Sequence, residues 1–191
     1  GVDYDFWLGP APERPFNSNR FTFNWRWFWD YGGGLLTDFC CHIVDLVHWA
    51  MEVDAPLTVT ASGGRFAITD NGETPDTLEA VYEYEKNGQN FLLVWSQTDA
   101  NSHGLEDQGL GIMFQGTEGT LVANYNTHKI IPEKGRTIPD VPKTLTRSVG
   151  HHREWLNAIK TREECSCNFG YGHRLSSVGQ LGNIALLTGE K

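Results

Sequence analysis

The longest apolar stretch of the sequence carries polar side chains at a helical spacing. Residues 35–51 read LLTDFCCHIVDLVHWAM, and within them His42, Asp45 and Trp49 follow Asp38 by four, seven and eleven residues. At about 100° per residue, these four side chains fall within about 60° of one another on a helix. The pattern predicts a helix over residues 35–51 with one polar stripe on an otherwise apolar surface.

Two explanations fit a polar stripe on such a helix. Unpaired carboxylates inside a protein core are very costly, so the stripe either pairs with neighbouring protein groups or lines a cleft where it meets a ligand. In the first case Asp38 and His42 form a structural pair one turn apart, or Thr37 or Asp38 caps the helix N-terminus. We favour the second case, in which the stripe is functional.

The chain after residue 56 alternates short apolar segments with turns. Asn-Gly pairs at 71–72 and 87–88 and the GTEG sequence at 116–119 are typical of turns. The segments rich in β-branched and aromatic residues are 57–61, 77–85, 90–97, 110–115, 120–124 and 128–131. Short strands at this spacing predict an antiparallel meander.

The pair Asn87-Gly88 predicts a hairpin, because a type I′ turn requires two positive φ angles and this dipeptide adopts them readily. Residues 81–85 alternate apolar and acidic or aromatic side chains, which indicates that one side of that strand faces solvent or a ligand. The partner segment Phe91–Trp95 is apolar at every position. We therefore expect an inner strand that is covered on both faces.

The two ends of the chain complete the expected organisation. Residues 1–31 indicate an extended, proline-punctuated arm, glycines 32–34 a flexible connection, and residues 151–162 and 173–188 two amphipathic helices. The predicted fold class is α+β, with a largely antiparallel open β-sheet and helices packed on one face. We expect one domain overall, divided into an arm with its glycine-rich connection at 1–34 and an α+β domain at 35–191.

The arm is unusually aromatic and also contains arginines. Eleven of the first 31 residues are aromatic, among them Trp7, Phe16, Phe21, Phe23, Trp25, Trp27, Phe28, Trp29 and Tyr31. So many exposed aromatic rings would promote aggregation, so the arm must pack on something. Aromatic rings beside arginine also suit the faces and hydroxyls of a sugar ring.

Composition and charge exclude several classes of partner. The 191 residues carry a formal net charge of −9, which disfavours nucleic acid because such binding depends on cationic side chains. No apolar run reaches the length of about 18 residues that a membrane span requires, so we expect no membrane partner. The four cysteines form two close pairs without C-x2-C spacing, and we expect free thiols.

Several separated motifs resemble one family. The run WRWFWDYGGGLLTDFCCHIVDLVHWAM is similar to the start of the substrate domain in the glucose-fructose oxidoreductase, inositol dehydrogenase and rhizopine-catabolism (Gfo/Idh/MocA) family, in its bacterial branch. The other shared motifs are WLGPAP at 7–12, PFN at 15–17, GTEGTL at 116–121, YGHR at 171–174 and LGNIA at 181–185. The resemblance spans nearly the whole chain. It implies a C-terminal domain like that of glyceraldehyde-3-phosphate dehydrogenase.

The resemblance also implies site residues. Asp38 and His42 match the catalytic acid and histidine of the family, with His42 as the acid/base for a sugar hydroxyl, and Asp45 matches the second acid of the motif. An imidazole oriented by a carboxylate one turn away suits proton transfer near neutral pH. Cys40 stands where the family usually has glycine, so a side chain enters a position of close packing.

The roles of the other candidate residues have two possible interpretations each. Trp25 and Arg26 either bind substrate or belong to the core. Tyr171, His173 and Arg174 either face a ligand or only dock the last helix, and His48 is expected at the surface or near a helix cap. A metal site formed by Asp38, His42 and Asp45 is a weaker alternative, because no second pair of ligands at helical spacing completes it.

The expected function is that of the substrate-binding C-terminal domain of an NAD(P)-dependent oxidoreductase acting on a sugar, cyclitol or related polyol. The family's dinucleotide-binding domain is absent from this sequence, since the glycines at 32–34 lack G-x-G-x-x-G spacing. We therefore expect no cofactor in this chain, NAD or NADP in the full-length protein, and little activity alone. The family also suggests a homo-oligomer formed through the open sheet face. The alternatives are a stand-alone carbohydrate-binding or oligomerisation module and part of an NAD-dependent glycosidase.

Overall fold

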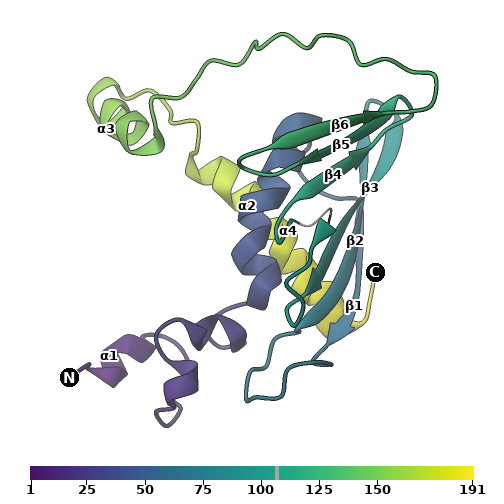
Figure 1. The fold of residues 1–191 in the computed structure, drawn as a ribbon. Coiled ribbons are helices and arrows are strands. Elements are labelled where there is room, and N and C mark those ends of the chain that lie inside the picture. Colours follow the sequence, from purple (N-terminus) through teal and green to yellow (C-terminus); the bar gives the residue numbers. More distant parts are fainter. Residues whose placement is uncertain (106–107) are drawn as a thin grey trace. The chain divides into compact units, whose positions relative to one another are not determined.

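The computed structural model describes residues 1–105 and 108–191 and divides into two compact units (Figure 1). The first unit contains residues 1–102 and 174–191, and the second contains residues 103–173. The mixture of helices with antiparallel sheets confirms the predicted α+β class. Across the described residues, no helix is both long and apolar enough to cross a membrane.

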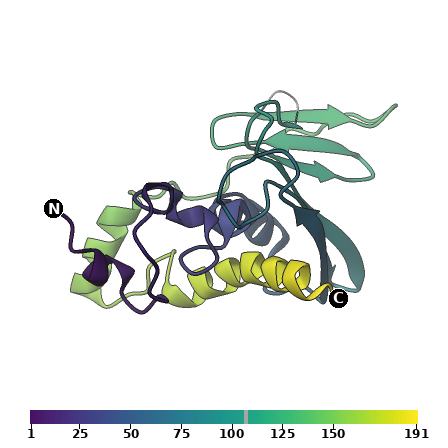
Figure 2. The same ribbon diagram turned by 90° about the horizontal axis from the view of Figure 1, so that it is seen from below.

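An antiparallel sheet and two helices form the core of the first unit. The strands are β1 (Thr58–Gly64), β2 (Thr77–Lys86) and β3 (Gln89–Thr98), with β2 in the middle. The helices α2 (Gly34–Met51) and α4 (Phe169–Thr188) lie on one face of this sheet (Figures 1 and 2). The residues of β2 that point towards them are all buried: Leu78, Ala80, Tyr82 and Tyr84.

The hairpin between β2 and β3 follows the sequence prediction, but the position of β3 does not. Asn87 and Gly88 have φ angles of 53° and 80°, which confirms the turn with two positive φ angles. However, β3 is an edge strand, and Leu92 and Val94 on its outer side are 65% and 56% exposed. The expectation of an inner strand covered on both faces is therefore wrong, because an apolar run does not reveal where the strand lies in the sheet.

Small residues allow α4 to approach α2 and the sheet closely. A Cβ atom added to Gly179 would lie 3.2 Å from the Cα atom of Thr37 and 3.4 Å from the Cβ atom of Cys40. Gly182 faces the hydroxyl of Tyr82 in the same way. The side chain of Cys40, which replaces the family's usual glycine, is buried here because glycine stands opposite it on α4. All four cysteines are free thiols, as predicted.

The start of α2 is fixed by contacts from both α4 and the β1–β2 loop. The side-chain amide of Asn183 donates a hydrogen bond of 2.8 Å to the carbonyl of Gly33. Gly34 has a φ angle of +72° and packs against Thr74, where a Cβ atom would lie 2.7 Å from the Cβ atom of Thr74. A residue with a side chain would strain both the backbone and the packing at Gly34.

His48 lies inside the protein, contrary to the expectation of a surface position. Its side chain is 5% exposed, and its Nε2 atom lies 2.9 Å from the hydroxyl of Tyr84. Burial lowers the pKa of His48. The residue shares a face of α2 with the buried residues Cys40 and Val44, which are eight and four positions earlier. That spacing was the sequence signal for burial.

The arm folds locally instead of running extended as predicted. It contains the short helix α1 (Tyr4–Leu8), capped by Asp3, and two 3₁₀ turns, η1 (Ser18–Arg20) and η2 (Asn24–Trp27). The rings that pack on one another are those of Tyr4, Trp7, Phe16, Phe21 and Tyr31. This cluster confirms that the aromatic residues of the arm require packing partners, many of which lie within the arm itself.

Glu73 attaches the arm to the β1–β2 loop. Its carboxylate accepts hydrogen bonds from Arg14 at 2.7 Å and from the backbone N–H of Trp29 at 2.9 Å. The N–H groups of Glu73 and Thr74 in turn donate to the carbonyl of Trp27, at 2.7 and 3.2 Å. These contacts fix the position of Trp27 relative to the loop.

The second unit contains a smaller antiparallel sheet, a helix and the first five residues of α4. Its strands are β4 (Ile112–Gln115), β5 (Gly119–Ala123) and β6 (His128–Pro132), with β5 in the middle. The helix is α3 (His151–Thr161), on which none of the residues is buried. All these elements lie within a residue or two of the predicted segments. The functional division predicted at residue 34 stays a prediction.

Candidate functional site

The polar stripe of α2 points away from the sheet. The buried side of the helix carries Leu36, Cys40, Ile43, Val44, Val47 and His48. On the other side, His42 and Trp49 are exposed, and the side chain of Asp38 is 31% exposed. Neither Asp38 nor His42 is sealed in the core, so both can meet a ligand.

Asp38 is paired with an arginine from the arm. The Nε atom of Arg26 lies 3.2 Å from Oδ2 of Asp38, and its Nη1 atom donates a hydrogen bond of 3.1 Å to the carbonyl of Phe23. The guanidinium carbon lies 4.6 Å from the ring centroid of Trp25 and 4.3 Å from that of Phe23. The structure thus brings together three predicted site residues, Trp25, Arg26 and Asp38.

The turn that delivers Arg26 depends on a glycine. The N–H of Gly32 donates to the carbonyl of Phe28 at 2.8 Å, and a Cβ atom on Gly32 would lie 2.8 Å from the carbonyl oxygen of Arg26. The backbone therefore folds back on itself between Arg26 and Gly32. This close approach places the end of η2 beside the first turns of α2.

His42 follows Asp38 by one turn of α2. The centroid of its ring lies 5.6 Å from that of Phe39, and Asp45 continues the stripe half-buried beyond it. An exposed imidazole near a carboxylate and a guanidinium can exchange protons with a ligand hydroxyl while the neighbouring groups orient that ligand. The arrangement is suited to acid/base chemistry on a hydroxylated molecule.

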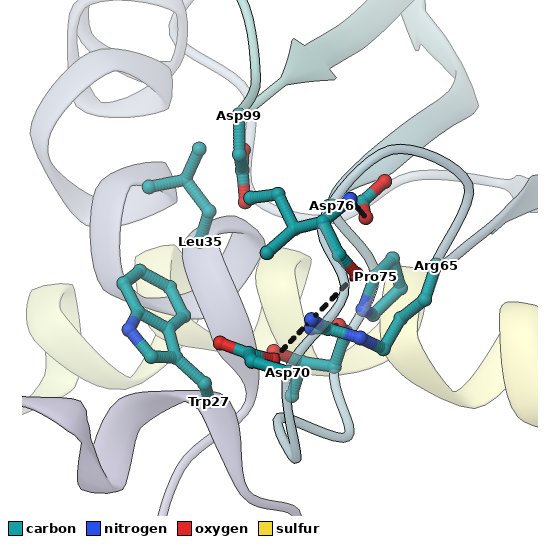
Figure 3. A pocket seen from close by; sticks show the side chains of 9 residues that line it. Trp27, Leu35, Arg65, Asp70, Pro75, Asp76 and Asp99 are labelled. Atoms are coloured by element: carbon teal, nitrogen blue, oxygen red, sulfur yellow. Dashed lines mark hydrogen bonds and ion pairs between the residues drawn. The ribbon is translucent and has the colours of Figure 1, made fainter. Parts of the chain in front are cut away.

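A pocket of about 340 Å³ adjoins the first turn of α2, and we call it the loop pocket (Figure 3). Its walls come from η2, the start of α2, the β1–β2 loop and the end of β3. The residues that line it are Trp27, Leu35, Arg65, Ile68, Asp70, Thr74, Pro75, Asp76 and Asp99. Leu35 and His42 are seven residues apart, so they lie on nearly the same side of α2 and about 10 Å apart along its axis.

Asp76 organises the loop around this pocket. Its carboxylate accepts hydrogen bonds from the N–H groups of Phe66, Ala67 and Ile68 at 2.8–3.1 Å, and from the hydroxyl of Thr77 at 2.9 Å. Burial alone would raise the pKa of Asp76, but these donors lower it to about 2. The carboxylate is therefore ionised throughout the neutral range.

A second pocket, the arm pocket, lies within the aromatic arm and has a volume of about 500 Å³. Its lining residues are Trp7, Leu8, Pro10, Ala11, Pro12, Trp25, Asp30 and Tyr31. Trp25 thus borders the arm pocket while its ring also contacts Arg26. The Trp25–Arg26–Trp27 segment links the arm pocket, Asp38 and the loop pocket.

Arg174, one of the predicted site residues near the C-terminus, does not lie beside Asp38. Arg174 pairs with Asp54 at 3.1 Å, beyond the end of α2, whereas Asp38 lies about 20 Å earlier along the helix. Tyr171 donates its N–H to the side chain of Asn168 at 2.8 Å, and both Tyr171 and His173 belong to the second unit. Substrate roles for Tyr171, His173 and Arg174 stay predictions.

No pattern in the sequence indicated the loop pocket. Arg65, Asp70, Asp76 and Asp99 stand in loops without regular spacing, and Trp27 was known only as one of many aromatic residues in the arm. Only the pairing of β1, β2 and β3 brings residues 65–76 and 99 to the same end of the sheet. Within residues 1–105 and 108–191, the structure contains no group of three or more His, Cys, Asp or Glu side chains arranged to hold a metal ion.

Comparison with known proteins gives a match over the whole chain. The family model described as the C-terminal alpha/beta domain of an oxidoreductase family matches residues 1–191. The WlbA dehydrogenase from Bordetella pertussis, solved in complex with NADH and UDP-GlcNAcA, has a TM-score of 0.60 and 19% sequence identity over 86% of this chain and 46% of that chain. No curated protein matches the chain.

A second solved structure has a similar fold. UDP-N-acetylglucosamine 3-dehydrogenase GnnA from Acidithiobacillus ferrooxidans has a TM-score of 0.53 and 18% identity, covering 91% of this chain and 51% of that chain. At such identities the likeness shows the fold. The chain spans about half the length of both solved proteins.

Proposed function

The chain belongs to the Gfo/Idh/MocA oxidoreductase family as its C-terminal α/β domain, and we propose that it forms the substrate-binding part of an NAD(P)-dependent oxidoreductase that acts on a sugar, cyclitol or related polyol. The observation that carries this proposal is the pair of half-buried Asp38 and exposed His42 on the open side of α2, with Arg26 held against Asp38. The two solved relatives are dehydrogenases, one of them in complex with NADH and a sugar nucleotide. Their likeness supports the reaction class.

The glycine run at residues 32–34 does not fit the pyrophosphate of a dinucleotide. Gly32 and Gly34 pack against Arg26 and Thr74, and a Cβ atom at either would come within 2.8 Å of protein atoms. This glycine run therefore leaves no open cradle for a pyrophosphate. On this proposal NAD or NADP is bound by a part of the enzyme outside these 191 residues, and it supplies the hydride acceptor.

The residues of this chain would bind and deprotonate the substrate. Oxidation of a secondary alcohol removes the O–H proton, and the exposed imidazole of His42 can accept it. Oδ2 of Asp38 is engaged by Arg26, which leaves its other carboxylate oxygen to accept a hydrogen bond from a substrate hydroxyl. Asp45, one turn beyond His42, and Trp25 would complete the contacts to the ring and its hydroxyls.

A turnover assay tests this proposal. The chain, joined to a dinucleotide-binding domain of its family or studied within its natural polypeptide, should reduce NAD or NADP in the presence of a polyol, measured by the absorbance of the reduced cofactor. His42→Gln should lower kcat by about 10²- to 10⁴-fold. His152→Gln changes an exposed histidine of the second unit and serves as the matched control. Full activity of His42→Gln would refute the role of His42.

One observation favours a second candidate function. The arm pocket combines Trp7, Trp25 and Tyr31 with the carboxylate of Asp30, which suits stacking on a sugar ring and a hydrogen bond to its hydroxyls. A stand-alone carbohydrate-binding module would show saturable binding to a neutral sugar by calorimetry without any cofactor. Loss of that binding in Trp7→Ala, with turnover unaffected, would separate this function from the oxidoreductase role.

A contact between copies of the chain is also part of the proposal. The outer side of β3 exposes Leu92 and Val94 on the face of the sheet opposite the helices, where Val94 lies opposite Val81 of β2 and Leu92 lies opposite Glu83. An apolar sheet face of this kind can be covered by a second copy.

A further inference from the structure

The loop pocket has apolar walls on one side and acidic groups at its two ends. Trp27 and Leu35 lie along one side, and Asp99 and Asp70 lie at opposite ends (Figure 3). Ile68 and Pro75 add further apolar surface. A volume of about 340 Å³ lies within the range of small-molecule sites.

The charges in this pocket do not balance. Asp70, Asp76 and Asp99 face one cation, Arg65. The guanidinium of Arg65 is already engaged by the carboxylate of Asp70 and by the carbonyls of Thr74 and Ile68, the last two at 3.2 and 3.1 Å. Arg65 therefore has little capacity left to neutralise a second carboxylate.

Asp99 is the acid whose charge is least compensated. Asp76 is satisfied by three N–H groups and a hydroxyl, whereas, within the described part of the chain, the carboxylate of Asp99 accepts one long hydrogen bond of 3.4 Å from Gln97. Its backbone N–H donates to the carbonyl of Asp76 at 2.8 Å, which holds the two acids close together. Asp99 is exposed to solvent, yet partial desolvation and the charge of Asp76 raise its pKa to about 6.

The position of Asp99 is fixed by a chain of hydrogen bonds. The indole N–H of Trp95 donates to Oε1 of Gln97 at 3.0 Å, and the amide of Gln97 donates to the carbonyl of Pro75 at 3.2 Å. Gln97 is buried, with 6% exposure. Asp99 thus stands in an exposed turn, two residues beyond Gln97, which is held in place by its hydrogen bonds to Trp95 and Pro75.

From the geometry and the charge of these groups we infer that the loop pocket binds the protonated amine of a polyol-like ligand, with Asp99 as the ion-pair partner and Trp27 as the apolar wall. An ammonium group would satisfy Asp99 with a charge-assisted hydrogen bond, and the carbon chain beside it would pack on Trp27, Leu35 and Pro75. A phosphate group would meet the acidic residues and be repelled. Metal ions are a poorer match, because the described residues provide no group of three metal-binding side chains.

This inference rests on the proposed function in one respect, namely that the pocket receives one end of the substrate. Leu35 lines the pocket and lies on the same side of α2 as His42, about 10 Å away along the axis. A substrate that reaches both places would carry its amine several atoms away from the hydroxyl that reacts. The preferred substrates are then amino sugars or amino polyols, and not phosphorylated or nucleotide-linked sugars.

Titration calorimetry with a matched pair of polyols tests the inference. Glucamine and sorbitol share the same carbon chain, but glucamine carries an ammonium group where sorbitol carries a terminal hydroxyl. At pH 7.5 the chain should bind glucamine at least about tenfold more tightly than sorbitol, which corresponds to one charge-assisted hydrogen bond. Sorbitol 6-phosphate should not bind.

Variants identify the group responsible. Asp99→Asn should weaken glucamine binding about tenfold and leave sorbitol unchanged, whereas Asp140→Asn, which changes an exposed acid of the second unit, should alter neither. Glucamine binding by the parent chain should also weaken between pH 7.5 and 4.5, as Asp99 becomes protonated. Equal affinity for glucamine and sorbitol, unchanged glucamine binding in Asp99→Asn, or binding of sorbitol 6-phosphate would each overturn the inference.

Failure here is distinguishable from failure of the proposed function. The calorimetric experiment needs no cofactor and no turnover, and His152→Gln, which changes an exposed histidine of the second unit, should bind glucamine as the parent does. Conversely, if Asp99→Asn retains full turnover of uncharged polyols while losing glucamine affinity, the oxidoreductase proposal and the amine site both stand. Turnover of polyols with no preference for amines would refute only the amine site.

Discussion

The substitution Gly182→Ala tests how tightly α4 packs on the sheet. A Cβ atom at Gly182 would overlap the hydroxyl of Tyr82 and lie 2.7 Å from Cδ2 of Leu36, whereas ordinary contacts begin at 3.4 Å. Tyr82 is 0% exposed and Leu36 is 1% exposed, so neither side chain can move into solvent. The helix itself must therefore shift away from the sheet.

The expected loss of stability follows from two opposing effects. Overpacking of a core costs about 1–3 kcal/mol, and the crowding from two buried groups favours the upper half of that range. Alanine gains about 1 kcal/mol over glycine through its helix propensity. The free energy of unfolding should therefore fall by about 1–2 kcal/mol, measured by urea denaturation with tryptophan fluorescence as the signal.

A double-mutant cycle isolates the contact. Tyr82→Phe removes a hydroxyl that has no hydrogen-bond partner within the described residues, so this change alone should cost little. In the Tyr82→Phe background, Gly182→Ala should lose much less stability, with a coupling energy of about 1 kcal/mol or more. Gly172→Ala, in the same helix with no atom within 4 Å of the added Cβ, should be neutral or stabilising. A stable Gly182→Ala protein, or a coupling energy of zero, would show that the packing argument is wrong.

Three further predictions concern the loop, the site and the sheet face. Asp76→Asn should lower the free energy of unfolding by about 2 kcal/mol at pH 7, because three N–H groups lose an ionised acceptor. The pKa of Asp76 is about 2 in the folded protein and 3.8 in its reference state, so this contribution is present above pH 4 and lost as the pH falls towards 2. The free energies of unfolding of the two proteins should therefore converge near pH 2. In the chain joined to a dinucleotide-binding domain, Arg26→Gln should reduce kcat/KM for a polyol about tenfold, or ~1.4 kcal/mol, because Asp38 loses its ion-pair partner. An unchanged kcat/KM would exclude a role of Arg26 in positioning Asp38. Val94→Lys should reduce self-association, measured as molar mass by light scattering. Identical molar masses for the variant and the parent chain at all concentrations would show that this sheet face is not the contact between copies.

The candidate site shows which of its features a local sequence pattern can predict and which it cannot. The stripe of Asp38, His42 and Asp45 follows from helical spacing alone, and the structure places it on the open side of α2. The partner of Asp38 did not follow from spacing, because Arg26 stands twelve residues earlier and reaches Asp38 only through the tight turn at Gly32. The arm contains three arginines among many aromatic residues, so the sequence did not single out Arg26 as the partner of Asp38.

Two errors have the same physical origin. The apolar run of β3 and the position of His48 were both assigned from the residue types in their segments, yet β3 is an edge strand and His48 is buried against Tyr84. Whether an apolar side chain is covered, or a polar one finds a buried partner, depends on which segments pack beside it. Residue type alone does not contain that information.

The sequence by itself determined the order and nearly the bounds of the strands and longer helices, the Asn87-Gly88 turn and the polar stripe of α2, because each depends on backbone geometry and side-chain periodicity within a few residues. Only the tertiary structure decided the strand order, the folding of the arm, the pairing of Arg26 with Asp38, and the loop pocket. The last two features join residues that are far apart in the sequence, 12 positions for Arg26 and Asp38 and 72 for Trp27 and Asp99, and they form only when these segments of the first unit have packed.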